Sequence, residues 1–174
     1  MIKYFYCEEC GNIHAAKFEF DAKYTDDNLE YHVNCYYKCK DCDNTAVEID
    51  SGMIRIIQRL NTTKLKTAYC CEGHIVTYDG VTGISRPYIV FKPTVTMELF
   101  NEIIGKCALP EKWGIDFDNE GNMIRIQYDM EETRIDTLIN DSSLFEAEKK
   151  CYLIDLETWV DKTMVLCEDI YDRV

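Results

Sequence analysis

The chain has no long apolar run, and this absence limits where the protein can reside. Nowhere in its 174 residues does an apolar stretch approach the roughly 18 residues that a membrane span requires. Residues 1–7 also lack the basic segment, apolar stretch and small-residue cleavage site of a secretory signal. We therefore expect a cytoplasmic protein with no membrane partner. In a reducing compartment, its 10 cysteines are thiols or metal ligands rather than a disulfide framework.

Positive charge is scarce as well. The 19 lysine and arginine residues face 32 aspartate and glutamate residues, for a net charge of −13. This balance excludes a protein that coats nucleic acid in general, although a local anion site remains possible. Residues 51–95 reverse the sign, with only Glu72 and Asp79 as acidic residues. The basic residues of this segment are Arg55, Arg59, Lys64, Lys66, Arg86 and Lys92.

Two Cys-x-x-Cys pairs are the clearest chemical signal in the sequence. Cys7 and Cys10 form the first pair, and Cys39 and Cys42 form the second. Four thiolates on two tight turns satisfy a tetrahedral zinc ion, with Zn–S bonds of about 2.3 Å. Such a closed shell leaves no position for a substrate, so we predict one structural zinc ion per chain. The alternatives for these four cysteines are unmetallated thiols or disulfides. Cys35, four residues before Cys39, could substitute as a ligand or face the core.

Apolar alternation and turn residues predict a zinc ribbon over residues 1–50. Strands are expected at 2–6 and 45–49, and also around residues 16–20 and 31–35. No flexible linker follows residue 50. We therefore expect the ribbon to pack on the domain formed by the remaining residues.

Residues 51–174 predict an α+β domain of two helix–strand–strand units followed by C-terminal helices. Ser51 is the expected N-cap of the first helix and Thr96 that of the second. In the first unit, strands at 66–70, 75–78 and 87–92 are expected, with a glycine-containing loop before the last of them. The second unit has strands at 114–117 and 123–128. This order predicts one antiparallel or mixed sheet with helices on one face.

Two helices show apolar stripes that predict their buried faces. The stripe of the first helix consists of Met53, Ile56, Ile57 and Leu60. The long C-terminal helix is expected to start at a capping box formed by Ser143 and Glu146. One of its faces carries Leu144, Ala147, Cys151 and Ile154, and a neighbouring face carries Tyr152, Leu156 and Trp159.

The turn from Cys71 to His74 lies in the basic segment and predicts a ligand site. Gly73 would let backbone N–H groups approach an anion, and His74 would donate to it. Forked contacts to the anion would come from Arg55, Arg59 or Arg86. In an alternative interpretation, Cys71 is a nucleophile activated by His74 and nearby cations. A third is a tight turn with a buried cysteine and an exposed histidine.

The residues around this turn form a motif with two resemblances. Lys66-Thr67-x-Tyr69-x-Cys71-x-Gly73-His74, followed by the strand Tyr88–Phe91, resembles a group of small bacterial and phage proteins of uncharacterised function. The turn is also similar to the Ser-Cys-Ser-Gly-Arg turn of the methyltransferase family of wybutosine synthesis in transfer RNA. Cys71 and Gly73 would match the cysteine and glycine of that turn. This second resemblance implies S-adenosylmethionine as cofactor and RNA as substrate.

The leading functional hypothesis is a zinc-binding protein that holds an anionic ligand, such as a nucleotide or an RNA element, near Cys71 and His74. A small transferase that uses the same turn is the first alternative. An adaptor that binds a protein partner through the zinc ribbon is the second. No pattern in the sequence indicates an oligomeric state or a particular reaction.

Overall fold

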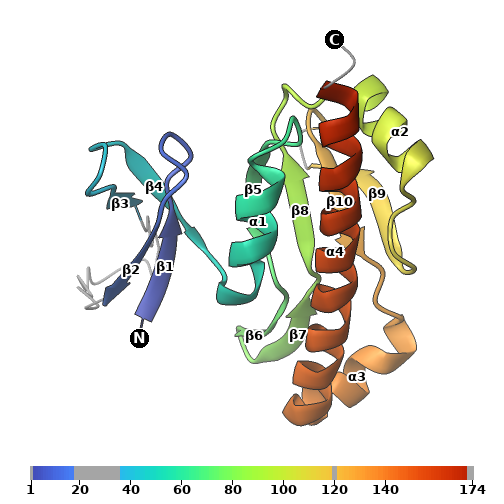
Figure 1. Ribbon diagram of the computed structural model, residues 1–174. Helices are drawn as coiled ribbons and strands as arrows, with labels where there is room; N and C mark the ends of the chain where they lie inside the picture. Colours follow the sequence, from blue (N-terminus) through green and yellow to red (C-terminus); the bar gives the residue numbers. More distant parts are fainter. Residues whose placement is uncertain (1, 18–35, 119–120, 172–174) are drawn as a thin grey trace. The chain divides into compact units, whose positions relative to one another are not determined.

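The computed structural model describes residues 2–17, 36–118 and 121–171, and the chain divides into two compact units, Met1–Ser51 and Gly52–Val174 (Figure 1). Helices and antiparallel sheets coexist, which confirms the predicted α+β class. Packing of the first unit on the second stays a prediction, and each unit is described by itself. None of the helices in the described residues combines the length and the apolar character needed to cross a membrane.

The first unit contains a four-stranded antiparallel sheet in the order β2-β1-β4-β3. Its strands are β1 (Ile2–Tyr6), β2 (Ile13–Lys17), β3 (Tyr36–Lys38) and β4 (Thr45–Ile49). The buried cluster beneath the sheet consists of Phe5, Cys7, Cys39 and Ala46. Two of its members are cysteines, and Tyr6 and Ile49 are buried in this unit as well. Cys35 and most of the strands expected at 16–20 and 31–35 lie outside the described residues.

The second unit contains a four-stranded antiparallel sheet and a separate hairpin. The sheet has the order β5-β8-β10-β9 and consists of β5 (Thr67–Cys71), β8 (Tyr88–Phe91), β10 (Ile124–Tyr128) and β9 (Trp113–Phe117). The hairpin pairs β6 (His74–Tyr78) with β7 (Val81–Ser85). The expected glycine-containing loop is therefore largely a strand. It brings Ser85 back to the level of His74, which is its partner in the hairpin register.

The helices of the second unit are α1 (Ile54–Leu60), α2 (Met97–Lys106), α3 (Glu132–Asn140) and α4 (Ser142–Tyr171). In Figure 1, α4 runs across the face of the sheet, beside α1. The predicted stripe of α1 is confirmed, since all four of its residues are buried. Thr96 caps α2 as expected, because its hydroxyl accepts a hydrogen bond from the backbone N–H of Leu99. Ser51 does not cap α1; a short 3-10 helix, Ser51–Met53, precedes it instead.

The start of α4 differs from the expectation, and only one of its two predicted apolar faces is buried. Asp141, not Ser143, caps the helix, because its carboxylate accepts the backbone N–H groups of Ser143 and Leu144, each at 3.1 Å. Cys151 is exposed, and so is Ile154. The core instead receives the neighbouring face, which carries Tyr152, Leu156 and Trp159. The two aromatic side chains on that face bury more apolar area, so the helix turns them inward.

Candidate metal centre and the Cys71 turn

The two Cys-x-x-Cys pairs lie on matching turns of the first unit. The backbone N–H of Gly11 donates to the carbonyl of Cys7 at 2.8 Å, and that of Asp43 donates to the carbonyl of Cys39 at 2.9 Å. Gly11 and Asp43 both have positive φ, at 73° and 62°. Each turn thus closes on a left-handed residue directly after its second cysteine, a position that glycine adopts without cost and aspartate tolerates.

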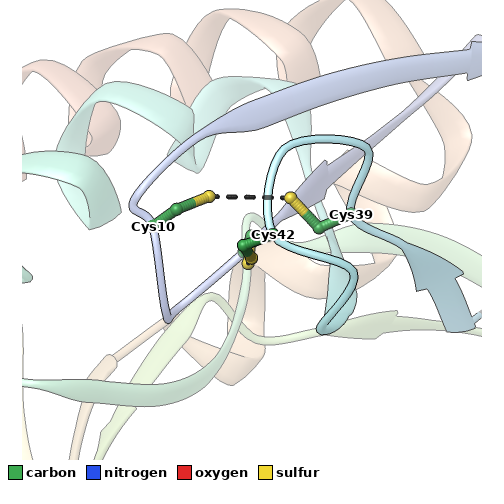
Figure 2. Close-up of side chains that lie close together, drawn as sticks. Cys10, Cys39 and Cys42 are labelled. Atoms are coloured by element: carbon green, nitrogen blue, oxygen red, sulfur yellow. Dashed lines mark hydrogen bonds between the residues drawn. The ribbon is translucent and has the colours of Figure 1, made fainter.

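These turns bring all four predicted ligands together. The sulfur of Cys10 lies 3.6 Å from that of Cys39, as Figure 2 shows. The sulfur of Cys7 lies 3.4 Å from that of Cys42. All four sulfur atoms lie within 4.8 Å of one another. Four sulfurs bound tetrahedrally at about 2.3 Å from one ion would be about 3.8 Å apart, whereas a disulfide bond measures about 2.0 Å. The cluster therefore has the dimensions of a metal site and not of two disulfides.

The electrostatics of the cluster also call for a cation. A backbone hydrogen bond from Asn12 lowers the pKa of Cys10, but burial and the contacts with the other three thiols outweigh it and raise the pKa to about 12. Without a cation, burial and the hydrogen bonds with the thiols of Cys39, Cys7 and Cys42 thus favour the protonated form of Cys10. A coordinated dication reverses this balance and deprotonates the thiols that bind it.

His14 lies beside the cluster, although the cysteine spacing does not reveal it. Its Nε2 is 3.1 Å from the sulfur of Cys39 and 3.5 Å from a carboxylate oxygen of Asp41. The side chain of Asn12 holds that same oxygen with a hydrogen bond of 2.6 Å. An imidazole nitrogen in contact with the sulfur of Cys39 orients that sulfur, as outer-shell partners of metal sites commonly do.

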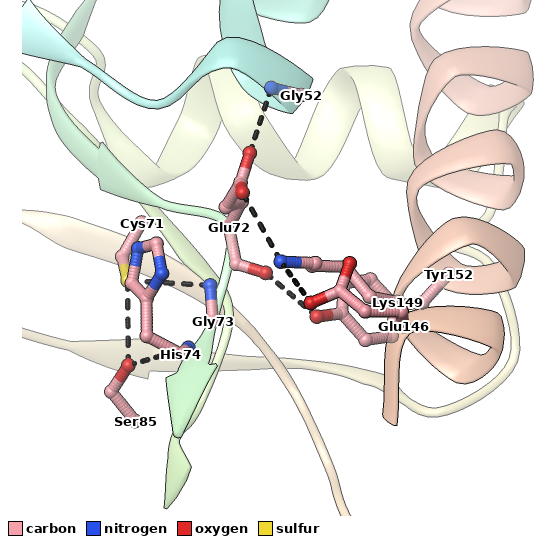
Figure 3. A network of polar contacts seen from close by, with 9 residues as sticks. All are labelled: Gly52, Cys71, Glu72, Gly73, His74, Ser85, Glu146, Lys149 and Tyr152. Carbon is pink, nitrogen blue, oxygen red and sulfur yellow. Dashed lines mark hydrogen bonds and ion pairs between the residues drawn. The ribbon is translucent and has the colours of Figure 1, made fainter. Parts of the chain in front are cut away.

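The second site predicted from the sequence lies where three strands end. Cys71 ends β5, His74 begins β6 and Ser85 ends β7. The backbone N–H of Gly73 donates to the sulfur of Cys71 at 3.3 Å, and the hydroxyl of Ser85 lies 3.6 Å from the same sulfur (Figure 3). Gly73 has a φ of 85°. The N–H group that we expected to meet an external anion is thus directed at the chain's own thiol.

The surroundings of Cys71 favour its thiolate. Burial of this half-buried side chain raises its pKa, but hydrogen bonds from His74, Gly73 and Ser85 outweigh burial and lower the pKa below the ordinary thiol value. The backbone N–H of His74 donates to the hydroxyl oxygen of Ser85 at 3.0 Å, which orients that hydroxyl. A sulfur with several donors around it has more thiolate at neutral pH than an ordinary cysteine.

A polar network between this turn and α4 holds the turn in place, and the sequence did not predict it. The carboxylate of Glu72 accepts the backbone N–H of Gly52 at 2.7 Å and the ammonium group of Lys149 at 3.2 Å. The hydroxyl of Tyr152 donates to the backbone carbonyl of Glu72 at 2.6 Å. The side chains of Glu72 and Lys149 are each only 12% exposed. Helix α4 therefore fixes both the carboxylate and the backbone of the turn.

The three arginines proposed to bind an anion are each paired with a carboxylate. Arg59 pairs with Asp161, and the other two pairs are Arg55–Glu157 at 2.8 Å and Arg86–Asp129 at 3.8 Å. The pairs of Arg55 and Arg59 join α1 to α4. The two arginines are four residues apart on α1, and their partners Glu157 and Asp161 are four residues apart on α4. An ion pair already compensates each arginine charge, and an anionic ligand held by Arg55, Arg59 and Arg86 stays a prediction.

Comparison with known proteins adds no further assignment. The chain matches no protein-family model, no curated protein and no solved structure. Both resemblances drawn from residues 66–91 therefore stay predictions, as do S-adenosylmethionine and RNA as binding partners.

Proposed function

We propose that this protein binds one zinc ion through Cys7, Cys10, Cys39 and Cys42, and that the ion stabilises the fold of the first unit. The observation that carries the proposal is the arrangement of four sulfur atoms, all within 4.8 Å of one another, on two matching turns. Tetrahedral four-sulfur sites bind zinc or iron, and zinc is the common structural ion in paired Cys-x-x-Cys turns.

A structural role follows from the composition of the site. All four coordination positions are taken by protein sulfur, so no position is left for a substrate or an activated water molecule. Two of the ligands, Cys7 and Cys39, are themselves part of the small buried cluster of this unit. The ion would therefore cross-link the turn that follows β1 to the turn that follows β3, next to this cluster.

Metal analysis of the purified protein tests the proposal. We expect about one equivalent of zinc per chain, which is the number that one four-thiolate site holds. Cys10→Ser removes one ligand and is expected to lose most of the bound zinc. Cys151→Ser is the matched control, because Cys151 is exposed on α4. Iron in place of zinc would contradict the identity of the ion, and equal zinc in both variants would contradict the ligand set.

Two wider hypotheses stay predictions alongside this proposal. Binding of a nucleotide or RNA element near the Cys71 turn predicts that Arg55→Glu combined with Arg59→Glu weakens that binding. An adaptor role for the ribbon predicts a protein partner whose binding requires the metal.

A further inference from the structure

We propose that Cys71 is a nucleophile that accepts an acyl group from activated esters or thioesters, with His74 as its proton partner and Ser85 as a positioning residue. This site lies in the second unit and does not depend on the proposed zinc centre. The proposal rests on two groups near the sulfur of Cys71, which ends β5. The hydroxyl of Ser85, from β7, lies 3.6 Å from that sulfur, and a ring nitrogen of His74, from β6, lies within 4.8 Å of it.

The donors around the sulfur suit a reaction in which negative charge moves. In the resting state, the N–H of Gly73, the hydroxyl of Ser85 and the side chain of His74 all stabilise the thiolate of Cys71. When sulfur bonds to a carbonyl carbon, the sulfur loses its charge and the carbonyl oxygen gains it. The donors that stabilised the thiolate can then stabilise the charge on this carbonyl oxygen, which is only two bonds from the sulfur.

The step balances with the groups present. The thiol of Cys71 passes its proton to the imidazole of His74. The resulting thiolate attacks the carbonyl carbon of the acyl donor, and the electron pair of the C=O double bond moves to oxygen. The tetrahedral intermediate collapses, the bond to the leaving oxygen or sulfur breaks, and the imidazolium of His74 gives its proton to that atom. The products are an acyl thioester on Cys71, a neutral imidazole and the released alcohol or thiol.

The network behind the turn supports a site that is held in place. The ion pair between Glu72 and Lys149 is largely buried, so the cost of desolvating the two charges offsets most of the stability that it adds. Its main effect is to fix the position of the Glu72 side chain. Burial, followed by the charges of Glu72 and Cys71, raises the pKa of Tyr152, so its hydroxyl stays protonated and continues to donate to the turn. The ammonium of Lys149 also contacts Glu146 at 3.0 Å, and it offsets the negative charge of both carboxylates near the thiolate.

Acylation of the full chain by para-nitrophenyl acetate tests the proposal. Release of nitrophenolate gives the rate, and peptide mass spectrometry assigns each acetyl group to a cysteine. We expect Cys71 to be acetylated at pH 7 about tenfold faster than the exposed Cys151 of the same molecules. Because the pKa of Cys71 is lowered, its acetylation rate should fall only when the pH drops through that lowered value.

Variants separate a chemical role from a structural one. His74→Asn is expected to slow acetylation of Cys71 about tenfold at pH 7 and to move the inflection of its rate–pH profile to higher pH. Ser85→Ala should change the acetylation rate and the inflection of the profile in the same direction, but by less. Cys70→Ser, next to the nucleophile, should change neither the rate nor the inflection. Acetylation of Cys71 no faster than that of Cys151 would overturn the proposal without any variant. So would an unchanged rate and profile in His74→Asn with native circular dichroism.

Discussion

Removing the metal is expected to unfold the first unit while the second unit stays folded. Zinc binding to small domains contributes about 10–16 kcal/mol of apparent free energy, and folding of the domain depends on it. Two of the four residues of the buried cluster, Cys7 and Cys39, are themselves proposed ligands, so loss of the ion is expected to disrupt that cluster. With a chelator present, backbone amides of β1 and β4 should exchange hydrogen at the rate of an unfolded chain.

The two tryptophans make the second half of this prediction measurable. Trp113 and Trp159 are the only tryptophans of the chain, and both are buried in the second unit. Their fluorescence should not change on chelation, and readdition of zinc should restore the exchange protection of β1 and β4. Full protection in metal-free protein would contradict a structural ion. A change in tryptophan fluorescence would contradict the independence of the second unit.

Substituting Gly73 is expected to destabilise the second unit strongly. An added Cβ would lie 2.9 Å from the hydroxyl of Tyr152 and 3.2 Å from the ring of Pro87. Tyr152 has little freedom to move, since its hydroxyl is bonded to Glu72 and its ring centroid lies 4.7 Å from that of Tyr128. The left-handed backbone adds about 1–2 kcal/mol and the crowding about 1–3 kcal/mol. We therefore expect Gly73→Ala to lower the free energy of unfolding by about 2–5 kcal/mol.

Gly80 offers a matched control for this substitution. It has a similar φ of 76°, but no atom lies within 4 Å of the position that its Cβ would occupy. Gly80→Ala should therefore cost only the backbone term, about 1–2 kcal/mol. Denaturant unfolding followed by tryptophan fluorescence measures both variants. Equal losses would show that Tyr152 and Pro87 do not constrain the turn.

The cluster of four cysteines could be predicted from the sequence because its signal is local. Each Cys-x-x-Cys spacing fixes two ligands on one turn, and coordination chemistry then demands that two such turns meet. The buried stripe of α1 could be predicted for the same reason, because the 3.6-residue period of a helix places its apolar residues on one side. His14 could not be foreseen, because its contact with Cys39 depends on the pairing of β1 with β2 and with β4.

The surroundings of Cys71 show where local reasoning ends. Ser85 reaches the thiol only because β6 and β7 pair, and a segment with a central glycine reads as a loop. Glu72 meets Lys149 across 77 positions in the sequence, a contact set by how α4 lies on the sheet. That placement in turn depends on which of two adjacent apolar faces of α4 is buried. Periodicity favoured neither face, and the larger aromatic area of Tyr152 and Trp159 decided between them.

X-ray absorption at the zinc edge of the purified protein tests the central claim most directly, because it reports the atoms around the ion. The structure predicts a single shell of four sulfur atoms at about 2.3 Å, with no oxygen or nitrogen ligand. A shell that contains nitrogen or oxygen at about 2.0–2.2 Å, or the absence of bound zinc, would contradict a closed site formed by Cys7, Cys10, Cys39 and Cys42.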